Sequence, residues 1–161
     1  MSEIIDRETQ ASRAMRIRRL SYSDLPAVIA IERRSFVTPW SLAMFVLELS
    51  KPSGICLAVL DQRERLIAYL VCSRYDEVWH LMNVAVDPSR RREGIATELI
   101  ETLFDRTRSD SKMTLEVRVS NLPAIRMYER FGFRSAGLRR RYYHDNDEDA
   151  LIMWREAALP I

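Results

Sequence analysis

The chain has 161 residues, of which 47% are hydrophobic, so it is long enough for one domain with a buried core and too short to predict two. Its 25 lysines and arginines are offset by 23 aspartates and glutamates, which argues against a strong overall attraction to nucleic acid. Two cysteines without CxxC spacing and the lack of a long apolar run argue against a disulfide framework, a zinc knuckle or a transmembrane helix. We therefore predict a cytoplasmic protein without a metal site.

The first elements in chain order are a leader, a short strand and two helices. Residues 1–14 lack any periodic pattern and are predicted to be a mobile leader, so the predicted domain spans residues 15–161. After the short strand in "RIRRL", Ser23 is a candidate N-cap for a helix that has Pro26 in its first turn. Ser41 is predicted to cap a second helix. The predicted apolar stripe of this helix consists of Leu42, Phe45, Val46 and Leu49.

Strands predominate in the middle of the chain. The segments "ICLAVL", "RLIAYLVCSRYD" and "EVWHLMNVAVD" are rich in β-branched and aromatic residues and are separated by short charged breaks, which indicates an antiparallel meander. A helical pattern begins at Gly94, with apolar residues on one face. The next strand, "MTLEVRV", alternates apolar and polar residues, so Glu116 and Arg118 share a face.

The last part of the chain predicts a helix followed by a β-hairpin. Asn121 is a candidate N-cap, Pro123 suits the first turn, and Gly132 is placed to end this helix. Two strands then flank an acidic tip from His144 to Asp149. The predicted order is βααβββαβαββ, a single α+β domain with a mixed, mostly antiparallel sheet flanked by helices.

The stretch "AVDPSRRREGIAT" places a turn between a strand and a helix. The first N–H groups of a helix have no intrahelical partners, and together with the helix dipole and nearby arginines they form a site for phosphate oxygens. Gly94 lets a diphosphate approach the backbone closely. The chain lacks the glycine pattern of a Rossmann fold and the Lys-Ser/Thr pair of a Walker loop. A solvated basic loop is the alternative interpretation.

The same turn resembles motif A of the GNAT superfamily of acetyl-CoA-dependent N-acetyltransferases. That motif reads (Arg/Gln)-x-x-Gly-x-(Gly/Ala), and here it is Arg91-x-x-Gly94-x-Ala96. Three further stretches, "IERRSFVTPWS", "LEVRVSNLPAIRMYERFGF" and "RRRYYHDNDEDALIM", resemble the bacterial ribosomal-protein-alanine N-acetyltransferases of this superfamily, the RimI type. The resemblance covers nearly all the chain after residue 15 and implies the GNAT fold, with acetyl-CoA as co-substrate and no metal.

The resemblance implies two kinds of contact with acetyl-CoA. Main-chain N–H groups of the turn bind the diphosphate. The strand before the turn hydrogen-bonds the pantetheine and orients the thioester carbonyl. The implied cofactor-binding residues are Val84, Ala85 and Val86 in the strand, Arg91, Arg92, Glu93, Gly94, Ile95, Ala96 and Thr97 in the turn and helix, and Asn121.

Acetyl transfer to an amine needs a neutral nitrogen and a stabilised thiolate, so a base and an acid are expected near the thioester. The resemblance implies Glu116 as base, directly or through a water, and Tyr128 as acid to the CoA sulfur. Taken alone, Glu116 is more often a strand carboxylate paired with Arg118. Likewise, Tyr128 taken alone is a packing residue beside Phe131.

The resemblance implies that the acceptor peptide lies between the hairpin and the loop around Pro39 and Trp40. The hairpin and this loop are expected to close over the peptide together. The tip, His144 to Asp149, departs from the proline and glycine often found there in the family, which leaves specificity open. His80 and His144 are rival bases, although the place of His80 in a strand favours packing. An edge-packing pair is the alternative for the two hairpin tyrosines. The implied substrate-binding residues are Pro39, Trp40, Tyr142 and Tyr143.

The implied acceptor group is the N-terminal α-amine of alanine on a ribosomal protein, small-subunit protein number eighteen. An α-amino group has a pKa of about 8 and a lysine amine of about 10.4, so the α-amine is easier to deprotonate by on the order of 3 kcal/mol. A lysine side chain or a small amine is the alternative acceptor. A non-catalytic RNA- or ribosome-binding module, suggested by Arg90–Arg92 and Arg139–Arg141, is a third hypothesis. The leading hypothesis predicts no direct nucleic-acid or membrane partner and leaves the oligomeric state open.

Overall fold

The computed structural model describes residues 15–107 and 111–156. The predicted leader, residues 1–14, lies outside the described residues. The elements are β1 (Arg16–Arg19), the 3-10 helix η1 (Tyr22–Asp24), α2 (Leu25–Ser35), α3 (Leu42–Ser50), β2 (Ile55–Leu60), β3 (Leu66–Tyr75), β4 (Val78–Val86), the 3-10 helix η2 (Pro88–Arg90), α4 (Ile95–Thr107), β5 (Lys112–Arg118), α5 (Leu122–Arg130), β6 (Arg134–Tyr143) and β7 (Glu148–Arg155). The predicted order of strands and α-helices is confirmed.

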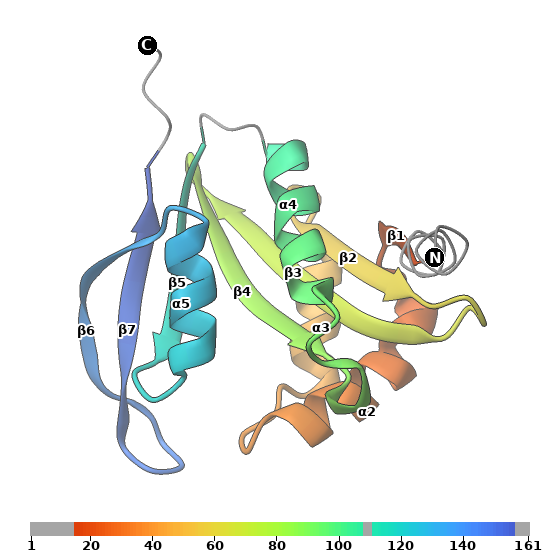
Figure 1. The fold of residues 1–161 in the computed structure, drawn as a ribbon, viewed down its shortest axis with the longest axis horizontal. Coiled ribbons are helices and arrows are strands. Elements are labelled where there is room, and N and C mark those ends of the chain that lie inside the picture. Colours follow the sequence, from red (N-terminus) through yellow and green to blue (C-terminus); the bar gives the residue numbers. More distant parts are fainter. Residues whose placement is uncertain (1–14, 108–110, 157–161) are drawn as a thin grey trace, which may run out of the picture.

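The strands form one mixed sheet in the order β1-β2-β3-β4-β5-β7-β6. Neighbouring strands are antiparallel except for β4 and β5, which are parallel. The β4–β5 ladder runs from Val78 opposite Lys112 to Leu81 opposite Leu115 and stops there, although both strands continue. Figure 1 shows the two strands diverging toward their C-terminal ends. We call the opening between Met82–Val86 and Glu116–Arg118 the wedge.

Helices cover both faces of this sheet. Leu99 and Leu103 of α4 and Ile125 of α5 belong to the apolar cluster on one face. Val28 of α2 and Phe45 of α3 belong to the cluster on the other face. Both cysteines are free and buried, and they belong to opposite clusters, Cys56 to the second and Cys72 to the first. Within the described ranges, no helix combines the length and apolar character needed to cross a bilayer.

Two of the predicted helix caps are confirmed and one is wrong. Ser41 Oγ accepts a hydrogen bond from Met44 N at 3.3 Å, and Asn121 Oδ1 accepts one from Ala124 N at 3.4 Å. The cap predicted at Ser23 is wrong, because this residue lies inside η1. Ser21 is instead the N-cap of η1, and its main-chain N–H donates to Asp24 Oδ2 at 2.8 Å.

The stripe predicted for α3 is only partly correct. Phe45 is buried, but Leu42 and Val46 are 54% and 39% exposed. Glu48 occupies the buried side of this helix in their place, at 8% exposed. Its carboxylate is accommodated there because Lys51 Nζ donates to it at 2.7 Å and Ser73 Oγ donates to its other oxygen.

Candidate functional site

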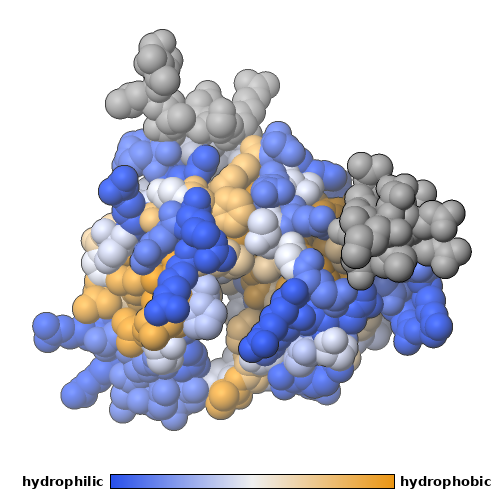
Figure 2. Space-filling view, viewed as in Figure 1, coloured by the Kyte–Doolittle hydropathy of each residue, from blue (hydrophilic) through white to orange (hydrophobic). Residues whose placement is uncertain are grey.

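The wedge exposes strand edges that have no partner in the described part of the sheet. On β4 the divergence begins at a bulge, because β3 pairs Cys72 with Leu81 and Val71 with Asn83, which leaves Met82 unmatched. Backbone N–H and C=O groups on such edges are available to an extended guest molecule. Figure 2 shows the surface hollowed in the lower half of the view, between α5 and the C-terminal end of β4.

The turn after β4 presents free N–H groups beside the wedge. Glu98 N donates to Gly94 O at 3.1 Å, so the amides that precede Glu98 at the start of α4 have no partner inside the helix. Arg92 and Gly94 both adopt positive φ, of 67° and 75°, in the left-handed region that is costly for a residue with a side chain. Strained positions of this kind cluster at binding sites.

The three arginines of this turn differ in their contacts. Arg90 Nε lies 2.8 Å from Glu93 Oε2, and its Nη1 lies 3.4 Å from Asp61 Oδ2 in the β2–β3 turn. Arg90 therefore links this turn to the β2–β3 turn, whereas Arg91 and Arg92 are exposed.

Glu116 lies at the wedge on the face of the sheet opposite to the α4 and α5 cluster. Its neighbours Leu115 and Val117 point into that cluster, so Glu116 points to the other face. Its Oε1 lies 3.0 Å from Arg139 Nε on β6, and its side chain is 27% exposed. The alternative pairing with Arg118 is not found, because Arg118 pairs with Asp145 and Glu148 in the hairpin.

Tyr128 is a residue of α5 and lies on the other face of the sheet, in the apolar cluster that contains residues of α4 and α5. It is 9% exposed, and its ring packs at 5.7 Å from that of Phe133. Burial raises the pKa of Tyr128 to about 12, and the nearby Tyr143 adds to the rise. Burial also raises the pKa of Tyr143 to about 12, with Glu116 among the smaller contributors. Tyr143 therefore lies within electrostatic reach of both Glu116 and Tyr128.

The hairpin bulges toward its tip, beyond the position where Arg118 pairs with Ala150. The register moves from Arg139 opposite Ala150 to Tyr143 opposite Glu148, and the bulge is held by a 2.9 Å hydrogen bond from Arg141 N to Asp149 Oδ1. The rings of Tyr142 and Tyr143 meet edge to face at 5.1 Å. The two tyrosines therefore pack against each other, as the alternative interpretation expected, and Tyr142 is still 43% exposed.

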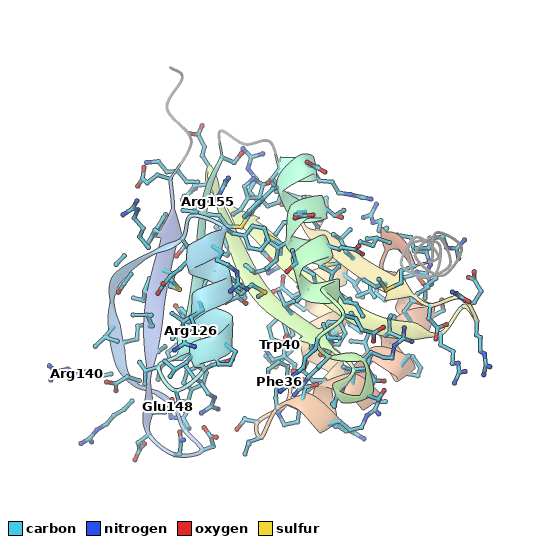
Figure 3. All side chains as sticks on the ribbon, in the orientation of Figure 1. Phe36, Trp40, Arg126, Arg140, Glu148 and Arg155 are labelled. Carbon is cyan, nitrogen blue, oxygen red and sulfur yellow. The ribbon has the colours of Figure 1, made fainter. Side chains whose placement is uncertain are left out.

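The acidic tip of the hairpin is attached to the end of β5. Arg118 Nη2 lies 2.9 Å from Asp145 Oδ1, and its guanidinium stacks 4.0 Å above the Tyr143 ring. Glu148 Oε2 accepts a 2.8 Å hydrogen bond from Ser120 N. Figure 3 shows Glu148 on one side of the opening and Trp40 with Phe36 on the other. The predicted tip residues therefore border the wedge.

The loop between α2 and α3 brings Pro39 and Trp40 to the opposite side of the opening. Pro39 is exposed, while Trp40 is half-buried with its ring 5.2 Å from that of Phe45. The main-chain N–H of Trp40 donates to Glu32 Oε1 at 3.0 Å. Sequence reasoning missed Glu32, although its spacing from Leu25 and Val28 already placed a carboxylate on the apolar side of α2.

The remaining predicted site residues separate into two groups. His80 packs against Tyr75 at 5.1 Å, and burial lowers its pKa, which is the packing role expected of it; His144 is exposed at the tip. Val84 and Val86 pack against the α4 and α5 cluster with their main chain at the wedge, and Asn121 caps α5. Among the described residues no group of His, Cys, Asp or Glu is arranged to hold a metal ion.

Comparisons with known proteins find relatives over most of the chain. The model of the Acetyltransferase (GNAT) family matches residues 25–133. The [ribosomal protein bS18]-alanine N-acetyltransferase of Escherichia coli K12 is 38% identical over 146 residues, 88% of this chain and 95% of that protein. An uncharacterized N-acetyltransferase of Methanocaldococcus jannaschii is 36% identical over 142 residues, 86% and 90% of the two chains. The crystal structure of the ribosomal-protein-S18-alanine N-acetyltransferase from Escherichia coli matches with a TM-score of 0.82 and 34% identity, covering 91% of this chain and 96% of that one.

Proposed function

The chain belongs to the GNAT family of acetyltransferases, and from this we propose that it moves an acetyl group from acetyl-CoA to the N-terminal α-amine of alanine on a ribosomal protein. The observation that carries the proposal is the wedge, which lies next to the N-terminus of α4 and has Glu116 on one face of the sheet, with Tyr128 in the cluster on the other face. The named activity of the Escherichia coli relative supports a ribosomal protein as acceptor.

Acetyl-CoA is proposed to bind along β4 and the turn. Val84–Val86 pair with β3 on one edge, and the free main-chain groups on the edge that faces β5 suit the amide groups of an extended pantetheine. The free N–H groups from Arg92 to Thr97 suit a diphosphate, which the positive end of α4 also attracts. The exposed Arg91 adds a positive charge there.

Catalysis is proposed to divide between two residues. Glu116 takes a proton from the α-ammonium, directly or through a water, and the neutral nitrogen attacks the thioester carbonyl carbon. The C–S bond then breaks, and Tyr128 gives its phenol proton to the departing sulfur. The acetylated nitrogen releases its second proton to solvent, and solvent restores the proton of Tyr128. The raised pKa of Tyr128, about 12, keeps the phenol protonated at neutral pH.

The acceptor peptide is proposed to lie on the face of Glu116, between the Pro39–Trp40 loop and Tyr142 and Tyr143. This placement is supported by the position of the loop and the hairpin tip on opposite sides of the opening (Figure 3). It lets an N-terminus reach Glu116 from outside while the thioester occupies the wedge.

A peptide panel tests the proposed acceptor. One peptide begins Ala-Arg-Tyr-Phe and contains no lysine, and the second has the same sequence with a blocked N-terminus and an added lysine. With acetyl-CoA we expect a mass gain of one acetyl group on the first peptide only. Acetylation of the second alone would move the acceptor to lysine, and salt-sensitive RNA binding without acetyl-CoA affinity would contradict the enzyme proposal.

A further inference from the structure

Glu32 of α2 is a carboxylate with only 1% of its surface exposed. Its Oε1 accepts a hydrogen bond from the main-chain N–H of Trp40 at 3.0 Å. Its Oε2 accepts the Tyr69 hydroxyl and, at 3.0 Å, Asn83 Nδ2. No lysine, arginine or histidine of the described ranges forms an ion pair with it.

The donors around Glu32 come from three different parts of the fold. Trp40 belongs to the loop after α2, Tyr69 to β3, and Asn83 to β4 directly after the bulge at Met82. An ionised carboxylate accepts hydrogen bonds at both oxygens and donates none, so it serves three convergent donors at once. A glutamine side chain has the same shape but only one acceptor oxygen. At least one of the three donors would then face the NH2 group of the glutamine and lose its hydrogen bond.

Stability alone gives little reason for a charge at this position. A buried carboxylate contributes little compared with a well-packed apolar side chain, because it loses its hydration. What the carboxylate provides, and an apolar side chain would not, is a fixed separation between the loop and β4. The two hydrogen bonds at 3.0 Å set that separation.

We propose that Glu32 is a positioning residue that holds the Phe36–Trp40 loop at a fixed distance from the wedge. One oxygen holds the loop that faces the acceptor, and the other holds β4 at the point where it leaves β5. The inference rests on the proposed function, since it assigns the loop to the acceptor side. Glu32 itself is too deeply buried to touch the substrate.

Glu32→Gln tests this role, with Glu48→Gln as the matched control. Glu48 is also buried, at 8%, but its partners are Ser73 and Lys51 and lie away from the loop. In Glu32→Gln we expect the KM for an alanine peptide to rise by about tenfold, because the loop is held through the Trp40 hydrogen bond. The Kd of acetyl-CoA should stay within about twofold, because β4 remains paired with β3 from Asn83 to Val86. Tyr69→Phe, which removes one donor, should raise the same KM by about threefold.

Hydrogen exchange of the Trp40 amide provides a readout that needs no catalysis. Its exchange rate should increase by about tenfold in Glu32→Gln and stay unchanged in Glu48→Gln. Equal effects of the two variants on the peptide KM, or an unchanged Trp40 amide, would overturn the positioning role. If the wild-type protein acetylates no α-amine, the proposed function fails, and the Trp40 amide still decides whether Glu32 holds the loop.

Discussion

Glu116 is held in place by the 3.0 Å pair of its Oε1 with Arg139 Nε. Glu116→Gln keeps the shape of the side chain and removes its ability to take a proton. We expect kcat on an alanine peptide to fall by about 100-fold, the usual range for a lost general base, with the Kd of acetyl-CoA unchanged. Steady-state kinetics and calorimetry check this, with the exposed Glu129→Gln as control. Full activity of Glu116→Gln would move the base elsewhere.

Tyr128 is expected to act through its protonated form. Its pKa is raised from 10.0 to about 12, so the phenol remains neutral above pH 10 and loses its proton only as the pH rises through about 12. Tyr128→Phe should lower kcat by about 100-fold, because the thiolate loses its donor. An absorbance titration of tyrosinate should show one late-titrating group fewer in this variant. A variant with wild-type kcat would reduce Tyr128 to a packing residue.

The turn before α4 depends on Gly94. Its φ is 75°, and no atom lies within 4 Å of an added Cβ, so Gly94→Ala should cost only about 1 kcal/mol of folding free energy, from backbone conformation. The methyl group would nevertheless occupy the surface that a diphosphate approaches. We expect the Kd of acetyl-CoA to rise at least about tenfold in calorimetry.

Gly137 offers the control for that experiment, since it also has positive φ, 152°, and no atom within 4 Å of an added Cβ. It lies on β6, away from the turn. Gly137→Ala should therefore bind acetyl-CoA like the wild-type protein. Equal affinities of the two variants would show that the diphosphate does not contact Gly94.

The hairpin tip should remain attached over most of the pH range. Hydrogen bonds from Ser120, ahead of those from Asn146 and Arg118, lower the pKa of Glu148 from 4.5 to about 2. Because the folded-state pKa is depressed, the stabilisation is complete above pH 4.5 and disappears as the pH falls through about 2. In urea unfolding, the wild-type protein should have a higher free energy of unfolding than Glu148→Gln above pH 4.5, and this difference should disappear as the pH falls through about 2. An advantage that persists unchanged to pH 2 would assign it to packing instead.

The elements were largely predictable because their signals are local. Alternation predicted β5, and the caps at Ser41 and Asn121 were read from residue type and position. The errors arose where tertiary contacts outweighed local pattern. Ser23 lies inside a 3-10 helix that Ser21 caps, and Asp24 precedes α2. Glu48 took a buried position that its own helix gave no reason to expect.

The whole site is assembled from segments that lie far apart in sequence, and this limits what one sequence predicts. The motif predicted the turn, and the resemblance of the stretch "LEVRVSNLPAIRMYERFGF" predicted Glu116 and Tyr128 as candidate catalytic residues. The pairing of Glu116 with Arg139, and the convergence of Trp40 and Asn83 on Glu32, depend on a bulge and on strand register. Single-residue shifts in register change which side chains meet, so these contacts had no local signal.

One peptide that carries both an N-terminal alanine and an internal lysine tests the molecule as a whole, because the two amines compete for the same enzyme. After reaction with acetyl-CoA, fragmentation by mass spectrometry locates the acetyl group. We predict that it resides on the N-terminal fragment, since the α-amine, with a pKa of about 8, loses its proton to a carboxylate far more readily than lysine. An acetyl group found only on the lysine fragment would contradict the proposed N-terminal acetyltransferase.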